Sequence, residues 1–163
     1  MELLIVVALI MILSAVGVGS FISSTTKSKD TQRKNDLNQL AKAVETFNND
    51  LGKYPSSITG SFLCYEKTSD VGGDVSCVGD KLTFRLDGKV TTYINIPKDP
   101  DSTQKYYYES DGASFSLYTA IQNLGDKDIL RDENGTMITY TSNGVSCGSS
   151  DCNYKLTETG LVK

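Results

Sequence analysis

Residues 3–22 read LLIVVALIMILSAVGVGSFI, a run in which no side chain is charged. As an α-helix, a run of this length spans about 30 Å, the thickness of the hydrocarbon core of a bilayer. A helix that is apolar on every face rarely belongs to the core of so small a protein. The run is also longer than the apolar region of a secretory signal peptide, and the acidic Glu2 stands where a signal peptide has basic residues. We therefore predict a helix whose whole surface is covered by lipid or by other protein.

The helix is predicted to continue beyond this run with one apolar side. Between residues 24 and 54, apolar residues recur at steps of three and four, while Lys, Glu and Asn occupy the other side. Gly52 and Pro55 then predict the end of the helix. We interpret the apolar stripe as the face that packs against a small sheet. Its members are Leu37, Leu40, Ala41, Val44, Phe47 and Leu51.

Two Asp-Gly pairs beyond Pro55, Asp87-Gly88 and Asp111-Gly112, each lie between short runs rich in β-branched and aromatic residues. Such pairs favour tight turns between strands, so each pair predicts a hairpin. The predicted strands cover residues 82–86 with 90–94, and residues 106–108 with 115–120.

A last short strand is predicted at residues 137–140, and residues 56–80 and 141–163 are predicted to be disulfide-bearing loops. The predicted fold class is therefore α+β, with one long N-terminal helix whose second half is laid on an antiparallel sheet. We divide the chain into an apolar helix (residues 1–23), an amphipathic half (residues 24–54) and a β-sheet head domain (residues 55–163).

The composition argues against enzymes and against nucleic-acid-binding proteins. The chain of 163 residues has a formal net charge of −4, charges of mixed sign and no histidine. It therefore has no broad basic face for nucleic acid, and it lacks the base of the usual catalytic triads. Neither a GxxxxGK[ST] nor a GxGxxG phosphate loop is present. We predict that the protein is not an enzyme and needs no cofactor, with calcium as the one cation to consider.

Four cysteines lie in the polar part of the chain: Cys64, Cys77, Cys147 and Cys152. An even count beside a membrane-type segment indicates an oxidising compartment, where disulfides form. Zinc is the weaker interpretation, because the spacings contain no CxxC and the chain has no histidine. Three pairings are possible from the sequence. We favour the nearest neighbours, Cys64 with Cys77 and Cys147 with Cys152, because each pair closes a short loop rich in Gly, Ser and Asp.

One acidic segment is a candidate calcium site. Asp126, Asp128, Asp132 and Asn134 lie within nine residues of a loop that contains two glycines, and oxygen ligands at alternating positions suit Ca²⁺. The spacing fits an EF-hand poorly, and we favour the alternative of a solvated acidic turn. The same segment contains Asn134-Gly135-Thr136, an N-glycosylation pattern that is too common to support a conclusion by itself.

Three segments resemble the N-terminal region of type IV pilins and of the pseudopilins of type II secretion. The first is ELLIVVALI at residues 2–10, the second is DTQRKNDL at residues 30–37, and the third is NDLGKYP at residues 49–55. In that family the glutamate is fifth in the mature chain, after a short basic leader is cleaved, whereas here Glu2 is second. The mature N-terminus and its methylation are therefore left open.

The resemblance implies a structural subunit, a major pilin, in a cell-surface filament that serves adhesion, motility or DNA uptake. It implies that copies assemble through the segment that begins with Glu2 and Leu3, and that Glu2 pairs with the N-terminal amine of a neighbour. It also implies that the helix unwinds near Gly17 and Gly19 on assembly, because glycine makes a helix easy to open. Close helix–helix contact in a membrane is the other interpretation of these glycines. Major pseudopilins also resemble this chain in placing calcium in a late loop.

The implied partners are further copies of this chain, an assembly machinery with an inner-membrane platform, and the membrane before assembly. Nucleic acid is a partner only if the filament takes up DNA. Two alternatives stay open: the major pseudopilin of a type II secretion system, and a membrane-anchored binding domain that never polymerises. The expected location is a cell-surface filament that is reached from a membrane-anchored state.

Overall fold

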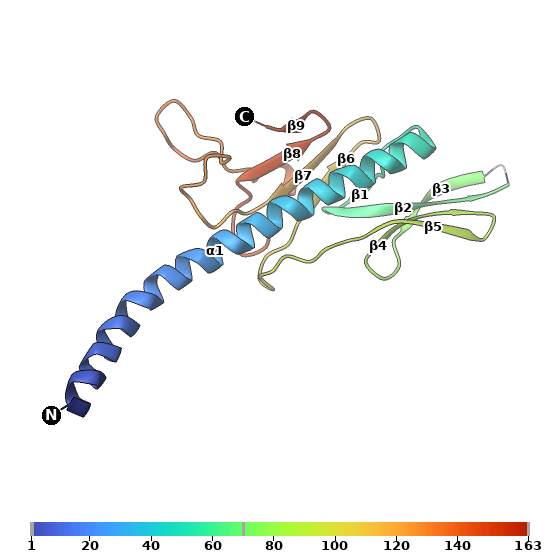
Figure 1. Cartoon of the computed structure of the whole chain (residues 1–163). Helices are drawn as coiled ribbons and strands as arrows, with labels where there is room; N and C mark the ends of the chain where they lie inside the picture. Colours follow the sequence, from blue (N-terminus) through green and yellow to red (C-terminus); the bar gives the residue numbers. More distant parts are fainter. Residues whose placement is uncertain (1, 70, 163) are drawn as a thin grey trace.

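α1 (Glu2–Leu51) is a long curved helix that projects beyond the rest of the chain at its N-terminal end (Figure 1). The structure is a computed structural model. It describes the backbone of residues 2–69 and 71–162, and the side chains within that set except those of residues 2, 14–20 and 143. Two small β-sheets lie beside the C-terminal half of α1 (Figure 1). The predicted α+β class is confirmed, but two sheets take the place of the predicted one.

The core lies between the C-terminal half of α1 and the two sheets. Apolar helix residues at steps of three and four pack together with aromatic and aliphatic residues from both sheets. Phe62 and Tyr108, one from each sheet, stack with their ring centroids 3.9 Å apart, so the core is continuous from one sheet to the other. The fully buried aliphatic and aromatic members with no exposed surface are Leu37, Leu40, Val44, Phe47, Leu82 and Leu117.

The C-terminal end of α1 lies where the sequence predicts it. Gly52, the first residue beyond the helix, adopts a left-handed φ of +71° and donates its N–H to the carbonyl oxygen of Asn48 at 2.7 Å. Glycine adopts this conformation without the steric cost that a Cβ brings. Asn48 would otherwise have a carbonyl without a helical partner, so this hydrogen bond caps the helix.

The first sheet has five strands and is mixed. β2 (Ser61–Thr68) pairs antiparallel with β1 (Ser57–Ile58) near its start and with β3 (Val71–Ser76) along the rest of its length. β4 (Lys81–Leu86) runs parallel to β2, and β5 (Lys89–Asn95) pairs antiparallel with β4. The parallel pairing of β2 with β4 is the departure from the antiparallel sheet that the sequence predicts.

The turn between β4 and β5 confirms the first predicted hairpin. Asp87 and Gly88 both have a positive φ, 47° and 82°, which a two-residue type I′ turn requires. The Asp87 carboxylate also accepts the N–H of Ser69 at 2.8 Å. This hydrogen bond ties the β4–β5 turn to the adjacent end of β2.

The second sheet is antiparallel. Its strands follow the order β6 (Tyr107–Ser110), β7 (Phe115–Thr119), β8 (Tyr154–Thr157) and β9 (Gly160–Leu161). The β6–β7 turn contains Asp111, whose carboxylate accepts two backbone N–H groups of the turn at 2.9 and 2.8 Å. The second predicted hairpin is therefore also confirmed.

The prediction of loops at residues 56–80 and 141–163 is wrong. The first range contains β1, β2 and β3. The second range contains the short 3-10 helix η1 (Ser142–Gly144), β8 and β9. β3 has the sequence VGGDVS, and glycine weakens the local preference for a strand. Its six-residue pairing with β2 supplies the stability that local propensity lacks. Residues 137–140, predicted as a strand, form isolated bridges in the described backbone, from Met137 to Arg131 and from Tyr140 to Cys152.

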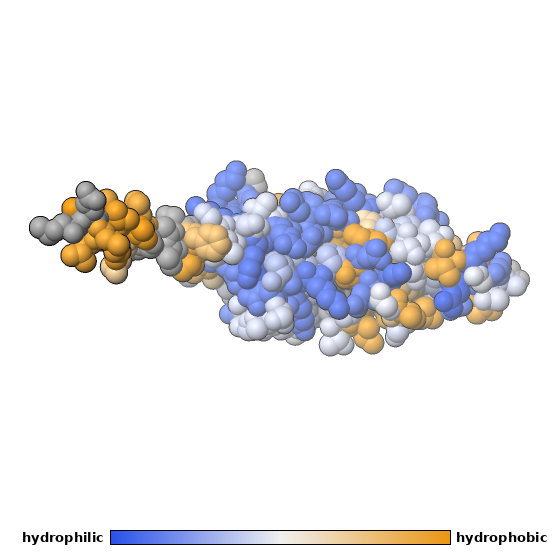
Figure 2. Space-filling view, turned by 60° about the horizontal axis from the view of Figure 1, so that its bottom comes forward, coloured by the Kyte–Doolittle hydropathy of each residue, from blue (hydrophilic) through white to orange (hydrophobic). Residues whose placement is uncertain are grey.

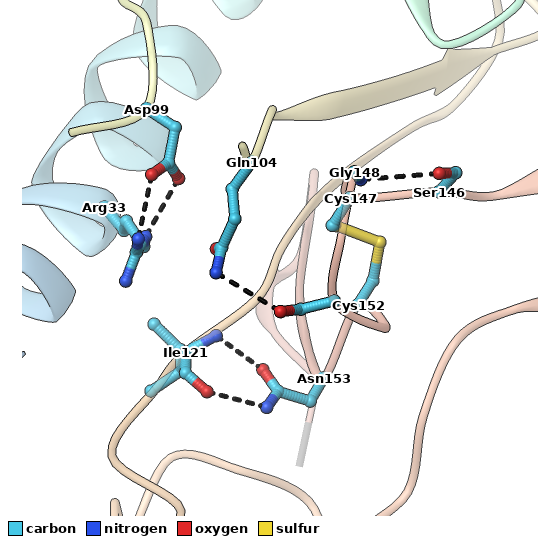
Figure 3. The surroundings of a disulfide bond; sticks show 10 residues. Arg33, Asp99, Gln104, Ile121, Ser146, Cys147, Gly148, Cys152 and Asn153 are labelled. Atoms are coloured by element: carbon cyan, nitrogen blue, oxygen red, sulfur yellow. Dashed lines mark hydrogen bonds and ion pairs between the residues drawn. A yellow bond between two sulfur atoms is a disulfide. The ribbon is translucent and has the colours of Figure 1, made fainter. Parts of the chain in front are cut away.

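Two disulfides join the cysteines in the favoured pairing. Cys64 pairs with Cys77, which ties β2 to the segment that follows β3. Cys147 pairs with Cys152 and closes a short loop ahead of β8 (Figure 3). Cys64 lies within a strand and not in a loop as predicted. Each disulfide restricts the unfolded chain and so stabilises the fold.

Candidate functional site

The N-terminal part of α1 carries large apolar side chains that are exposed. Every described side chain from Leu3 to Leu13 is exposed, with Leu3 at 76% and Leu13 at 72%. Phe21 and Ile22, at 73% and 62%, carry further exposed apolar surface nearer the body of the molecule. Figure 2 shows it as an orange end that extends from a mostly blue body. Contiguous apolar surface of this kind marks a site of association with protein or membrane.

The length of this projecting part follows from the first contact of α1 with the body. Among the side chains of α1 that the structure describes, the first buried one is that of Asp30, and the rise of about 1.5 Å per residue places Leu3 about 40 Å away along the helix axis. Burial of one leucine side chain contributes about 1.5–3 kcal/mol, so a surface with several exposed leucines strongly favours association.

The predicted membrane span, Leu3–Ile22, includes residues 14–20, whose side chains lie outside the described set. Among the described residues, no helix combines the length and the apolarity needed to cross a membrane.

The four predicted assembly residues all lie in this part of α1. Leu3 is exposed, and the backbone is helical from Glu2 through Gly17 and Gly19. The side chain of Glu2 and the surroundings of both glycines lie outside the described residues. The predicted pairing of Glu2 and the predicted unwinding at the glycines therefore stay predictions.

A buried ionic cluster of Asp30, Arg33 and Asp99, called here the Arg33 cluster, holds α1 to the body where the exposed part begins. Arg33 donates from Nε and Nη2 to the two carboxylate oxygens of Asp99, each at 2.8 Å, and from Nη1 to Asp30 at 2.8 Å. The side chains of Arg33 and Asp99 have no exposed surface. Figure 3 shows the guanidinium and the Asp99 carboxylate facing each other from α1 and the segment after β5.

Backbone groups complete the Arg33 cluster. The Asp30 carboxylate accepts the N–H of Gln122 at 2.9 Å and that of Asn123 at 2.7 Å, so the segment after β7 is held to α1 as well. Burial by itself lowers the pKa of Arg33, but the hydrogen bonds and charges of Asp99 and Asp30 outweigh it and raise this pKa. Arg33 therefore remains charged at any physiological pH, and each of the two carboxylates accepts hydrogen bonds from several donors.

Two tyrosines tie further turns of α1 to the sheets. Tyr106 donates its hydroxyl to Asp36 at 2.6 Å, and Tyr93 donates its hydroxyl to Asp50 at 2.8 Å. Burial and the neighbouring carboxylate raise the pKa of both phenols, so both remain donors. The helix is thereby fixed by polar contacts along its C-terminal half, from Asp30 to Asp50.

The candidate calcium ligands do not converge in the structure. Lys34 places its ammonium nitrogen 2.7 Å from oxygens of both Asp126 and Asp128. Burial raises the pKa of Asp126, but the hydrogen bonds from Lys34 and from the backbone of Asp128, together with the nearby lysine charges, outweigh it and lower this pKa. Asp132 instead accepts N–H groups within its own turn, to which Asn134 belongs. Within the described part of the chain, no three acidic or metal-binding side chains are grouped to hold a metal ion.

Sequence analysis missed the Arg33 cluster, although one signal for it was present. Asp30, Arg33 and Leu37 follow one another at steps of three and four, so the two charged residues lie on the same side of α1 as the apolar stripe. Charged residues on a buried face need partners. No pattern in the sequence identifies Asp99 as that partner.

The arrangement is suited to association with other molecules. It combines an apolar helical surface with a rigid polar attachment at the point where this surface leaves the body. A comparison with known proteins finds no matching family model, no matching curated protein and no matching solved structure.

Proposed function

We propose that this chain is the structural subunit of a cell-surface filament of the type IV pilin kind, assembled through the exposed part of α1. One observation carries the proposal: the apolar side chains from Leu3 to Leu13 have no cover from the chain's own body. Copies of the same chain supply that cover when their helices bundle. The three segments that resemble pilins give independent support.

The proposed assembly begins in a membrane, where residues 3–22 are covered by lipid. An assembly machinery then moves the subunit into the filament, and each apolar segment exchanges lipid for neighbouring helices. The division of α1 into an apolar first half and an amphipathic second half has a purpose in this scheme, because only the first half is left for contacts between subunits. Such head-to-tail contacts produce an open filament and not a closed oligomer.

Three residues have proposed roles in assembly. Glu2 enters a low-dielectric bundle, where a carboxylate needs a partner, and the N-terminal amine of an adjacent copy supplies one. This pair sets the register between copies. Gly17 and Gly19 give the helix a place to unwind as the subunit leaves the membrane.

The Arg33 cluster contributes a fixed geometry to the proposed filament. A homopolymer needs every copy to present its interface in the same direction relative to its body. Four hydrogen bonds made by Arg33 and Asp30 to other segments of the chain, all at 2.7–2.9 Å, hold α1 at the point of exit. The direction in which α1 leaves the body is therefore the same in each copy.

The test is electron microscopy of sheared cell-surface material from cells that produce the chain. Wild-type cells should yield filaments. Leu9→Asp places a charge in the exposed apolar surface and should abolish them, because an unpaired charge in the helix bundle is costly. Gln39→Asp is the control, since it adds the same charge at an exposed position on the anchored half of α1.

Each contrary result has a defined meaning. Filaments of normal yield from Leu9→Asp would exclude assembly through this surface. The absence of filaments from wild-type cells would favour a membrane-anchored domain that does not polymerise. Short fibres that stay within the periplasm would favour the pseudopilin of a type II secretion system.

A further inference from the structure

Asn134 is the only asparagine in the sequence that is followed, at the second position, by serine or threonine. The pattern Asn134-Gly135-Thr136 has no proline at its middle position, as the N-glycosylation acceptor pattern requires. Because this pattern is common in proteins, the structure around Asn134 decides whether the pattern supports glycosylation.

The structure places this pattern at the tip of a tight turn. Arg131 and Met137 form an antiparallel bridge at its base. Inside the bridge, Asp132 donates its N–H to the carbonyl oxygen of Thr136 at 2.9 Å, and Gly135 donates its N–H to the carbonyl oxygen of Asp132 at 2.9 Å. Gly135 takes a left-handed φ of +79°, which reverses the chain directly after the asparagine. The turn is therefore held by its own backbone.

The side chain of Asn134 is left available by these contacts. The Asp132 carboxylate accepts the backbone N–H of Asn134 at 2.9 Å and that of Thr136 at 2.7 Å. Among the hydrogen bonds of the described residues, none involves the side-chain amide of Asn134. All residues from Arg131 to Thr136 are exposed, in a connection that projects beside β8 (Figure 1). A bulky group on Asn134 would therefore not displace the core.

The compartment implied by the disulfides fits this modification. Cys64–Cys77 and Cys147–Cys152 leave no free cysteine among the described residues, which is typical of proteins that mature in an oxidising compartment. Transfer of oligosaccharides to asparagine takes place on the same side of the membrane. This support is independent of filament formation.

We infer that Asn134 is an N-glycosylation site. The co-reactant is an oligosaccharide carried on a polyprenyl diphosphate, and the catalyst is a membrane-bound oligosaccharyltransferase. The amide nitrogen of Asn134 forms a bond to the anomeric carbon of the sugar, and the bond from that carbon to the diphosphate oxygen breaks. The diphosphate leaves with the electron pair, and the amide nitrogen gives up one proton to a base of the transferase. Thr136 supplies the hydroxyl that the transferase recognises.

The experiment is mass spectrometry of the full chain purified from the envelope of its native host. Trypsin releases residues 132–155, which contain both Asn134 and Asn143, each followed by glycine. Wild type should carry a glycan mass on Asn134. Asn134→Gln and Thr136→Ala should abolish it, and Thr136→Ser should retain it because the hydroxyl is kept. Asn143 is the internal control, since no hydroxyl residue follows at the required position.

The result that overturns the inference is an unmodified Asn134 in the wild-type protein. A glycan that persists in Thr136→Ala would also overturn it, because the modification would then not depend on the acceptor pattern. Deamidation of an Asn-Gly bond gives only a small mass gain and occurs in Thr136→Ala as well. If that gain is the one change seen at Asn134, the inference fails.

Discussion

The two halves of α1 belong to one helix but differ in how far the rest of the chain buries their side chains. Leu40 in the C-terminal half has no exposed surface, whereas Leu9 in the N-terminal half is 56% exposed. The C-terminal half is stabilised by the core, by the Arg33 cluster and by two tyrosine hydroxyls. Most helical stability in proteins comes from such packing and not from local propensity. Within the described side chains, the body of the molecule gives the N-terminal half no such packing.

The largest expected loss of stability comes from removing the charge of Arg33, which is buried in the C-terminal half of α1. Arg33→Ala leaves the carboxylates of Asp99 and Asp30 buried without their partner, which costs about 3–5 kcal/mol of unfolding free energy. Urea unfolding of the full chain in a mild detergent measures this change. Lys27→Ala, at an exposed position of the same helix, should change the free energy by less than about 0.5 kcal/mol. Similar values for the two variants would show that the Arg33 cluster does not anchor the helix.

A matched pair of leucine variants tests the comparison directly. Leu40→Ala opens a cavity in the core and should lower the free energy of unfolding by about 2–5 kcal/mol. Leu9→Ala should leave this quantity nearly unchanged in the isolated subunit and lower the yield of filaments. A stability loss in Leu9→Ala equal to that in Leu40→Ala would mean that the body covers both halves.

A smaller effect is expected from replacing the two glycines of the N-terminal half of α1, and it concerns the stability of the helix itself. Gly17→Ala and Gly19→Ala should each favour the helical state by about 1 kcal/mol, since alanine loses less backbone freedom than glycine. In circular dichroism of the chain in detergent, both variants should keep more helix than wild type as the temperature rises. Filament yield should fall if unwinding is part of assembly. Unchanged filament yield in the double variant would argue for close helix contact as the role of these glycines.

The smallest expected effect is the pH dependence of the contact between Lys34 and Asp126. The folded-state pKa of Asp126 is lowered, so its contribution is fully present above the unfolded pKa of about 3.9 and is lost as the pH falls through the folded value. A partly exposed pair of this kind contributes about 0.2–1 kcal/mol. Unfolding at a series of pH values should show a larger loss in wild type than in Lys34→Met, in which Asp126 keeps only the hydrogen bond from the backbone of Asp128. An equal loss in both would assign it to other carboxylates.

Sequence analysis predicted the features that depend on neighbours in the chain. The helix end at Gly52 and the hairpin turn at Asp87-Gly88 follow from local backbone preferences, and both are confirmed. The division into two sheets and the parallel pairing of β2 with β4 did not follow, because both are set by tertiary packing. Arg33 and Asp99 are 66 residues apart, so no local pattern connects them. For the projecting half, the sequence predicts apolarity, and the structure adds that the body leaves it exposed.

The position of the Arg33 cluster has a mechanical consequence. Any pull on the projecting end of α1 travels along the helix and first meets the body at Asp30 and Arg33. There the tension divides in parallel among the Asp99 carboxylate and the N–H groups of Gln122 and Asn123, which belong to different segments of the chain. Shared tension of this kind must break several short bonds at once before the helix slides. The Arg33 cluster therefore carries the tension first, and the apolar core is loaded only after these hydrogen bonds break.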